Sequence, residues 1–128
     1  MHAMSRCTGP RCTGVRCIGW SALLAALLAA DPAASAPVDV FCTPNQVVVF
    51  TDAPRLQVRC DESFGGVVYF AAPTADPAQA SRILSVIQTA LVAGRTLIVN
   101  YEPADVSGAG IGCQSTDCRL IRRIGFGK

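Results

Sequence analysis

The sequence has little charge and few aromatic residues, and its only histidine (His2) and only tryptophan (Trp20) lie near the N-terminus. Charged residues make up 16% and aromatic residues 6% of the 128 residues. We predict that residues 1–36 are removed as a leader, which leaves a mature chain without histidine. A Ser-His or Cys-His nucleophile is then excluded, and we expect a protein that is not an enzyme and that holds no cofactor.

Residues 1–36 have the pattern of a signal peptide. Three Arg-Cys units around Cys7, Cys12 and Cys17 supply a basic flank, and residues 18–30 form an uncharged apolar segment. Residues 34–36 read Ala-Ser-Ala, which fits the small-residue motif for cleavage. The apolar segment is shorter than the about 20 residues that span a bilayer. We therefore expect a secreted or periplasmic protein without stable membrane insertion, whose mature chain begins close to Val38.

The mature chain, residues 37–128, has no net charge. Loss of Arg6, Arg11, Arg16 and Asp31 leaves eight basic and eight acidic residues. Nucleic-acid binding depends on clustered Lys and Arg, so the neutral balance argues against a nucleic-acid partner. About 90 residues make one domain, and a domain of this size gains much of its stability from disulfides.

Four cysteines remain in the mature chain, and an even number in a small exported protein predicts two disulfides. Three pairings are possible. We favour Cys113 with Cys118 across a short loop, and Cys42 with Cys60 as a link between the first two strands. A zinc site would need a C-x2-C knuckle or a histidine, and the mature chain has neither.

One amphipathic helix is predicted between Asp76 and Gly94. Asp76 followed by Pro77 and Gln79 is typical of a helix N-terminus, and Gly94 is typical of the position after a helix. Apolar residues recur at three- and four-residue steps on one face, with Ile87 at the centre. They are Ala80, Ile83, Leu84, Ile87, Ala90 and Leu91.

Five strands are predicted from the apolar runs. In residues 55–61 apolar and polar residues alternate, which indicates a half-buried strand. The order of elements predicts a small α+β protein, a five-stranded OB-like barrel with the helix between the third and fourth strands. An open meander with the helix on one face has the same order and remains the alternative. The predicted strands are residues 46–51, 55–61, 67–71, 95–101 and 119–126.

The stretch from Gly94 to Val99 together with the stretch from Gly112 to Cys118 resembles the second half of the B subunits of subtilase-cytotoxin and typhoid-toxin type. Those proteins have a helix, a strand and a C-x4-C pair near the C-terminus. The resemblance implies an exported OB-fold protein that assembles as a pentamer and binds sialylated glycans. It covers about half of the mature chain and assigns no glycan-contact residue, and this sequence continues further beyond its last cysteine than that family does.

A few side chains are candidates for ligand binding. Tyr69 and Tyr101 could stack on a sugar ring or belong to the core. Glu102 with Asp105 could act as a carboxylate pair or form an exposed turn. Arg122 and Arg123 are neighbours in a strand, so their side chains should point to opposite faces. One of them could then face the interior or a rim, where it needs a carboxylate, while the alternative is that both reach water.

We therefore expect an exported binding module for a glycan or a protein surface. The alternative is a structural or inhibitory interaction domain with no small-molecule ligand. Residues 47–50 read Val-Val-Val-Phe without alternation, which predicts that both faces of this strand are covered. A neighbouring copy in a homo-oligomer could supply part of that cover.

Overall fold

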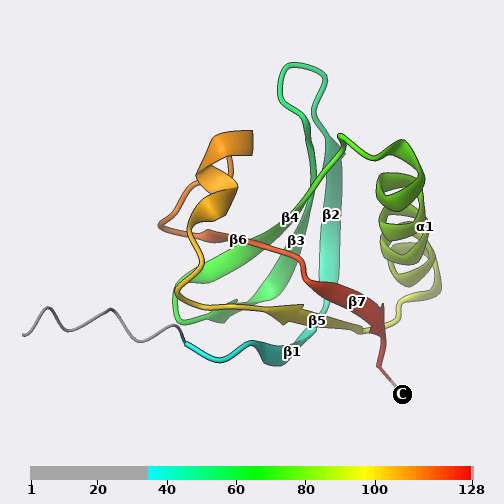
Figure 1. Cartoon of the computed structure of the whole chain (residues 1–128). Helices are drawn as coiled ribbons and strands as arrows, with labels where there is room; N and C mark the ends of the chain where they lie inside the picture. The colour runs from blue at the N-terminus through cyan, green and yellow to red at the C-terminus, as the bar shows by residue number, and fades with distance from the viewer. Residues whose placement is uncertain (1–34, 128) are drawn as a thin grey trace, which may run out of the picture. The chain divides into compact units, whose positions relative to one another are not determined.

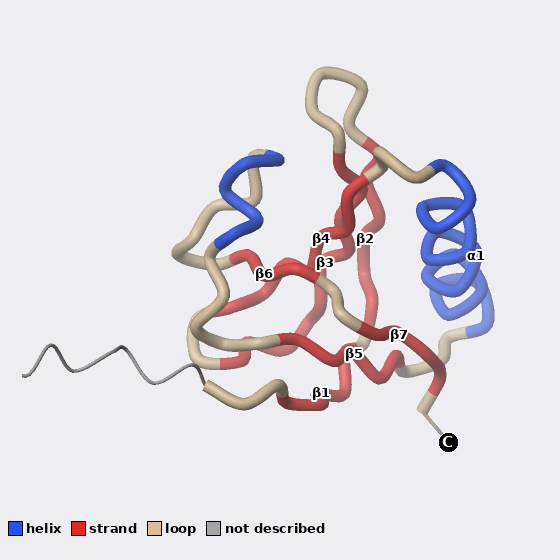
Figure 2. The backbone as a smooth tube through the Cα atoms, viewed as in Figure 1, coloured by secondary structure: helices blue, strands red, loops and turns tan. Residues whose placement is uncertain are grey.

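The computed structural model describes residues 35–127. This part of the chain has seven strands, one α-helix and one short 3-10 helix (Figures 1 and 2). It is therefore a small α+β protein made mostly of strands, as predicted. In order, the elements are β1 (Val38–Cys42), β2 (Pro44–Val49), β3 (Arg55–Phe64), β4 (Val67–Pro73), α1 (Pro77–Ala93), β5 (Leu97–Tyr101), η1 (Ser107–Ile111), β6 (Cys118–Leu120) and β7 (Arg123–Phe126).

The strands form two sheets. The smaller sheet has the order β1-β5-β7, and the larger has the order β2-β3-β4-β6. All neighbouring strands are antiparallel except β4 and β6, which are parallel. The chain passes from one sheet to the other four times. Two of these crossings are long, from β4 to β5 through α1 and from β5 to β6 through η1, and two are short, between β1 and β2 at Thr43 and between β6 and β7 at residues 121–122. The two short crossings hold the ends of the two sheets close together.

A closed barrel is not confirmed, because the hydrogen-bonded strands form two separate sheets. The open meander is also wrong, since β4 and β6 are parallel and β1, β5 and β7 are not consecutive in the chain. The sequence missed β1, because its residues follow directly on the leader. The predicted last strand is two strands, since the Ile121 N–H donates to Ala71 in the larger sheet and the Arg122 N–H donates to Asn100 in the smaller one.

Helix α1 begins and ends where the sequence predicted. The Asp76 side chain accepts from the backbone N–H groups of Ala78 and Gln79, at 2.9 and 3.1 Å. Gly94 follows the helix with φ of +61°, a left-handed conformation that glycine adopts without steric cost. The predicted apolar face turns inward, with Ala80, Ile87 and Ala90 buried. The helix contacts β2 and β7 from opposite sheets, so it bridges the two sheets (Figure 1).

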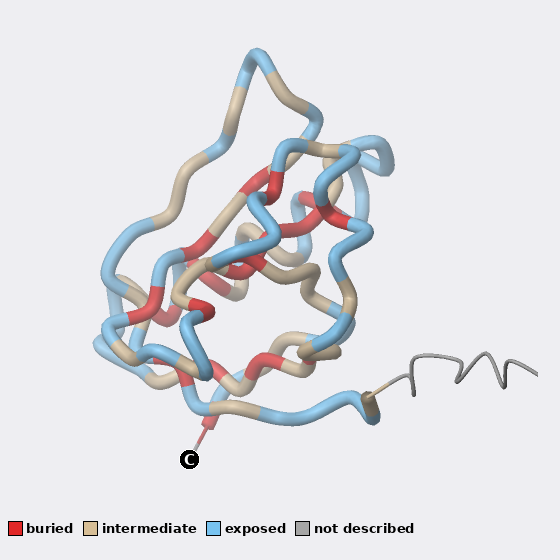
Figure 3. Tube along the Cα trace, turned by 90° about the vertical axis from the view of Figure 1, so that its left-hand side faces the viewer, coloured by how far each residue is buried: buried red, intermediate tan, exposed pale blue. Residues whose placement is uncertain are grey.

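The main core lies between the inner faces of the sheets and helix α1. Phe70, Ile87 and Val99 in this core are fully buried. Figure 3 shows how burial varies along the chain, and most of the buried residues belong to the strands and helix α1. The centroids of the Phe70 and Tyr101 rings lie 5.0 Å apart. A second, smaller cluster of Ala71, Cys113 and Cys118 is separate from the main core.

Both predicted disulfides are confirmed, Cys42 with Cys60 and Cys113 with Cys118. We expected the first disulfide to link two neighbouring strands, and this part of the prediction is wrong. Cys42 ends β1 in one sheet, and Cys60 lies in β3 of the other. The disulfide therefore links the two sheets close to the point where the chain crosses between them. Two disulfides fit a protein of the secreted type.

The predicted leader falls largely on residues 1–34, which lie outside the described residues. Within residues 35–127, no helix is long and apolar enough to cross a membrane.

The Val-rich run in and after β2 is only partly covered. Val47 packs on the main core, and the Arg55 guanidinium lies over the Phe50 ring, 3.9 Å from its centroid. Val49, by contrast, is 52% exposed. The expectation that both faces are covered is therefore met at Val47 and Phe50 and fails at Val49.

Candidate functional site

The outer face of the larger sheet is polar because β3 alternates as the sequence predicted. Leu56, Val58 and Cys60 are buried toward the core. Arg55 and Gln57 therefore face away from the core, and Tyr69 and Ala71 of β4 share this outer face through the antiparallel register.

The Cys113–Cys118 loop covers part of this outer face. Cys113 and Cys118 form the second buried cluster with Ala71, and Tyr69 packs against it. The Asp117 carbonyl accepts from the N–H groups of Val68 and Tyr69, both at 3.0 Å. The loop is thus fixed to β4 by backbone hydrogen bonds as well as by apolar contact.

Arg119 of β6 ties the long connection between β5 and β6 together. Its Nε donates to the Pro103 carbonyl and its Nη1 to the Ser115 carbonyl, both at 2.7 Å. These bonds join the start and the end of the connection. The loop that covers the outer face is therefore braced on two sides.

A cavity of about 260 Å³ lies between the outer face and the disulfide loop. We call it the Arg55 cavity. Strand β3 contributes Arg55 and Gln57, β4 contributes Tyr69, and the loop contributes polar side chains and backbone. The loop residues in its wall are Gly112, Gln114, Asp117 and Cys118.

Arg55 is the most unusual side chain in this wall. Its Nη1 donates to the Ile111 carbonyl at 2.9 Å, whereas its Nε is buried and has no hydrogen-bond partner. Arg55 also forms no ion pair with any carboxylate of residues 35–127. The side chain lies against the Gly112 backbone, where a Cβ would collide with Nη1. Gly112 has φ of +83°, so both the space and the backbone favour glycine there.

A half-buried guanidinium without an anion has lost water without gaining a full set of partners. A carboxylate or another oxyanion from a ligand would pair with it through charge-assisted hydrogen bonds. The Arg55 cavity can therefore bind an anionic group beside an aromatic side chain and several amide or carboxylate groups.

The two predicted tyrosines lie in different environments. Tyr69 is half-buried and lines the Arg55 cavity. Tyr101 is only 4% exposed and packs on Phe70 in the main core, and burial raises the pKa of its hydroxyl. A ligand-binding role for Tyr101 is therefore wrong, because the inward-facing position that it occupies in β5 belongs to the core.

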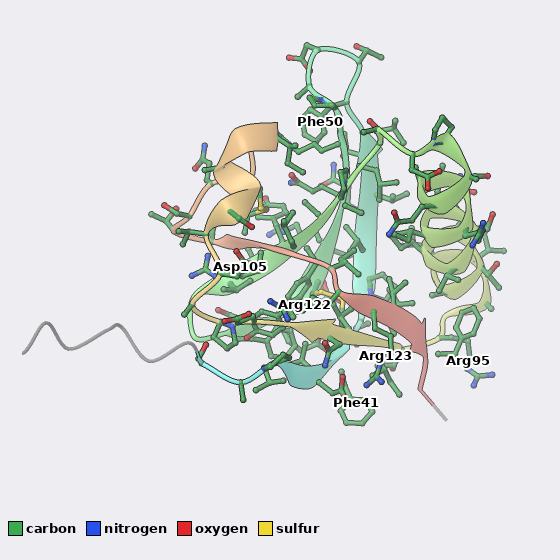
Figure 4. The ribbon with its side chains drawn as sticks, viewed as in Figure 1. Phe41, Phe50, Arg95, Asp105, Arg122 and Arg123 are labelled. Carbon is green, nitrogen blue, oxygen red and sulfur yellow. A yellow bond between two sulfur atoms is a disulfide. The ribbon has the colours of Figure 1, made fainter. Side chains whose placement is uncertain are left out.

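The predicted charged residues form ion pairs within the domain. Arg122 pairs with Glu102. Arg123 pairs with Asp39 of β1 at 3.0 Å, and Asn100 also donates to Asp39 at 2.8 Å. Arg122 and Arg123 are exposed, and they lie where the chain enters β7 (Figure 4). Each therefore has a carboxylate partner of its own, and neither lines the Arg55 cavity.

Glu102 and Asp105 do not form a carboxylate pair. The Glu102 carboxylate forms an ion pair with Arg122, and the Asp105 carboxylate accepts a hydrogen bond from the Ser107 N–H at 2.9 Å. The hydrogen bonding from Ser107 lowers the pKa of Asp105. The raised pKa that a general acid needs is not found at Asp105, and these two residues fit a structured turn.

The sequence did not single out Arg55, Gln57, Gln114 and Asp117. The alternation of residues 55–61 already placed Arg55 and Gln57 on a polar face, and this was the available signal. That face lies opposite a loop more than 50 residues later in the chain. Only the tertiary structure brings these groups together.

Acid is expected to destabilise the fold through three carboxyl groups. Hydrogen bonds from Asn100 and Arg123 lower the pKa of Asp39, and hydrogen bonding from Ser107 lowers that of Asp105. Burial raises the pKa of Glu62, but hydrogen bonds from Thr43 outweigh it and the net shift is downward. The unfolded chain therefore binds protons more tightly, so the stability that these groups contribute is present above their unfolded-state pKa.

We expect urea midpoints to be constant from pH 7 to about 5.5 and to fall below about pH 4.5, as these carboxyl groups become protonated. The Asp39→Asn variant should show a smaller decrease across the same range. An identical decrease in the variant would contradict a contribution from Asp39.

Comparisons of the chain with protein-family models, with curated proteins and with solved structures found no match.

Proposed function

We propose that the protein is an exported binding module that holds an acidic sugar residue of a glycan in the Arg55 cavity. The observation that carries this proposal is the half-buried Arg55, which has an unpartnered Nε and no ion pair with a described carboxylate. A volume of about 260 Å³ is below the about 300–1,000 Å³ of sites for drug-sized ligands. It suits one terminal sugar residue rather than a long segment of chain.

The polar groups around the cavity match the chemistry of such a sugar. Arg55 would pair with its carboxylate. The Tyr69 ring offers an apolar face for the sugar ring, and Gln57, Gln114 and Asp117 can exchange hydrogen bonds with hydroxyl groups. Neutral sugars would use the same hydrogen bonds without the ion pair.

We also propose that the two sheets form an OB-like arrangement. The order of strand neighbours supports it: β2-β3-β4-β6 continues through the β6–β7 connection to β7-β5-β1 and returns from β1 to β2. If β1 with β2, and β6 with β7, count as two bent strands, the chain has five strands in cyclic order. The parallel β4–β6 pair and the helix between β4 and β5 agree with this interpretation.

The position of the cavity supports the two proposals together. OB-folds bind oligosaccharides and oligonucleotides on the face of their second and third strands, beside the loops that join strands 1 to 2 and 4 to 5. In an OB-like arrangement these strands are β3 and β4. The β2–β3 loop ends at Arg55, and the β5–β6 connection contains the disulfide loop. The position of the Arg55 cavity beside these strands and connections supports both proposals.

A glycan array probed with the oxidised exported protein tests this function. Oligosaccharides that end in a sialic or uronic acid should bind, and their neutral counterparts should bind more weakly or not at all. Arg55→Gln should reduce binding by about tenfold or more, because a hydrogen-bonded charge is lost. Arg59→Gln is the matched control, since it removes the same charge from the same strand outside the cavity.

A second variant separates position from charge. Gly112→Ala keeps the Arg55 charge but forces its guanidinium to move, so it should also weaken binding of acidic glycans. If acidic and neutral glycans bound equally well, or if Arg55→Gln and Arg59→Gln behaved alike, the proposed site would be wrong.

Export and assembly remain part of the proposal. The leader pattern and the two disulfides support a secreted or periplasmic location. The resemblance to toxin B subunits suggests a homo-oligomer, and exposed apolar side chains such as Phe41 at 64% and Val49 at 52% support self-association. The competing function is an interaction domain that buries such side chains against a protein partner and recognises no glycan.

A further inference from the structure

A second cavity, independent of the Arg55 cavity, lies between helix α1 and strand β7. Its volume is about 250 Å³. The helix contributes Arg82, Ile83 and Val86, and the chain entering and forming β7 contributes Arg122, Arg123 and Ile124. We call it the α1–β7 groove. Helix α1 and β7 lie next to each other in the fold (Figure 1).

Strand β7 is an edge strand on the side of this groove. Strand β5 pairs with one side of β7, and no strand of residues 35–127 pairs with the other. Helix α1 stands beside β7, but a helix bonds its backbone groups internally and cannot complete a sheet. The backbone groups on the unpaired side of β7 therefore have no strand partner among residues 35–127, and unpaired groups of this kind can pair with an added strand.

The charge of the groove selects the type of segment that fits. Three arginines line it and no acidic residue does. Arg122 and Arg123 are partly neutralised by Glu102 and Asp39, whereas Arg82 forms no ion pair with a residue that the structure describes. Between the arginines the wall is apolar, with Ile83, Val86 and Ile124 half-buried. An occupant with both acidic and apolar side chains is complementary to this wall.

We propose that an extended segment of a partner protein, in which acidic and apolar residues alternate, binds the α1–β7 groove by pairing with the free side of β7. Successive side chains of a strand point to opposite faces. The apolar ones would rest on Ile83 and Ile124, while acidic ones reach the arginines at the rim, and main-chain hydrogen bonds to β7 would supply the pairing. The leader of this chain does not fit, because its arginines repel those of the groove.

The probe is a peptide of eight residues in which glutamate and valine alternate. The control is a peptide of the same length in which lysine and valine alternate. We expect the acidic peptide to shift amide NMR signals of α1 and β7 in the oxidised exported protein, and the basic peptide to have no effect. Raising the salt from about 50 mM to about 0.5 M should weaken binding, since exposed charges are then screened.

Two changes test the mode of binding. Arg82→Glu should weaken the acidic peptide by about fivefold or more, whereas Arg59→Glu on the other side of the larger sheet should have no effect. N-methylation of one of the two alternating sets of peptide amides should abolish binding, because only that set faces β7.

Three results would overturn the proposal. The first is no binding of the acidic peptide at about 1 mM, a concentration that detects even weak complexes. The second is equal binding of the basic peptide, or signal shifts confined to elements other than α1 and β7. The third is a stable dimer by light scattering with the β7 amides protected from exchange, which would assign the groove to a second copy of the chain.

Discussion

Ile87→Ala is expected to lower the free energy of unfolding by about 2–5 kcal/mol. Ile87 is fully buried at the centre of the inward face of α1, so the substitution removes apolar contacts and leaves a cavity that the core only partly refills. The helix bridges the two sheets through contacts to β2 and β7. Urea denaturation of the oxidised protein at neutral pH measures the effect as a shift of the midpoint.

Val92→Ala is the matched control for Ile87→Ala. Val92 lies on the same helix but is 90% exposed, so its truncation should change stability by no more than about 0.5 kcal/mol. A loss of that small size at Ile87 would show that the apolar face of α1 does not pack on the sheets in solution.

Removal of the Cys42–Cys60 disulfide should cost about 3 kcal/mol or more. The two cysteines are 18 residues apart, and the chain-entropy treatment gives about 3 kcal/mol for a loop of that length. Both side chains are also fully buried in the main core, so their replacement by alanine removes packing as well. The double variant Cys42→Ala/Cys60→Ala, studied by urea denaturation, tests this expectation.

Removal of the Cys113–Cys118 disulfide should cost less, about 2 kcal/mol, because only five residues separate the cysteines. If the proposed function holds, this removal should also weaken glycan binding, since this loop forms one wall of the Arg55 cavity. A larger loss of stability in Cys113→Ala/Cys118→Ala than in Cys42→Ala/Cys60→Ala would contradict the expectation that the Cys42–Cys60 disulfide contributes more to stability.

The sequence by itself determined the features that depend on neighbours in the chain. The helix is set by the Asp76 cap, the three- and four-residue spacing of apolar side chains and Gly94, all within about 20 residues. The alternation of residues 55–61 determined which side chains of β3 face the core. The cysteine spacing and the strand order made the observed disulfides the preferred pairing, because each joins residues that turns bring close together.

Only the tertiary structure decided the features that depend on distant residues. The sequence predicts a single strand from Arg119 to Phe126. The structure has two strands there, because the consecutive amides of residues 121 and 122 bond to Ala71 in one sheet and to Asn100 in the other. The two tyrosines have the same chemistry, and their packing alone puts Tyr101 in the core and Tyr69 at a cavity. Arg55 lines a cavity because a loop that follows 56 residues later accepts its hydrogen bond and covers its strand. Such contacts follow from how the sheets, helix and loop pack together, which local sequence patterns do not encode.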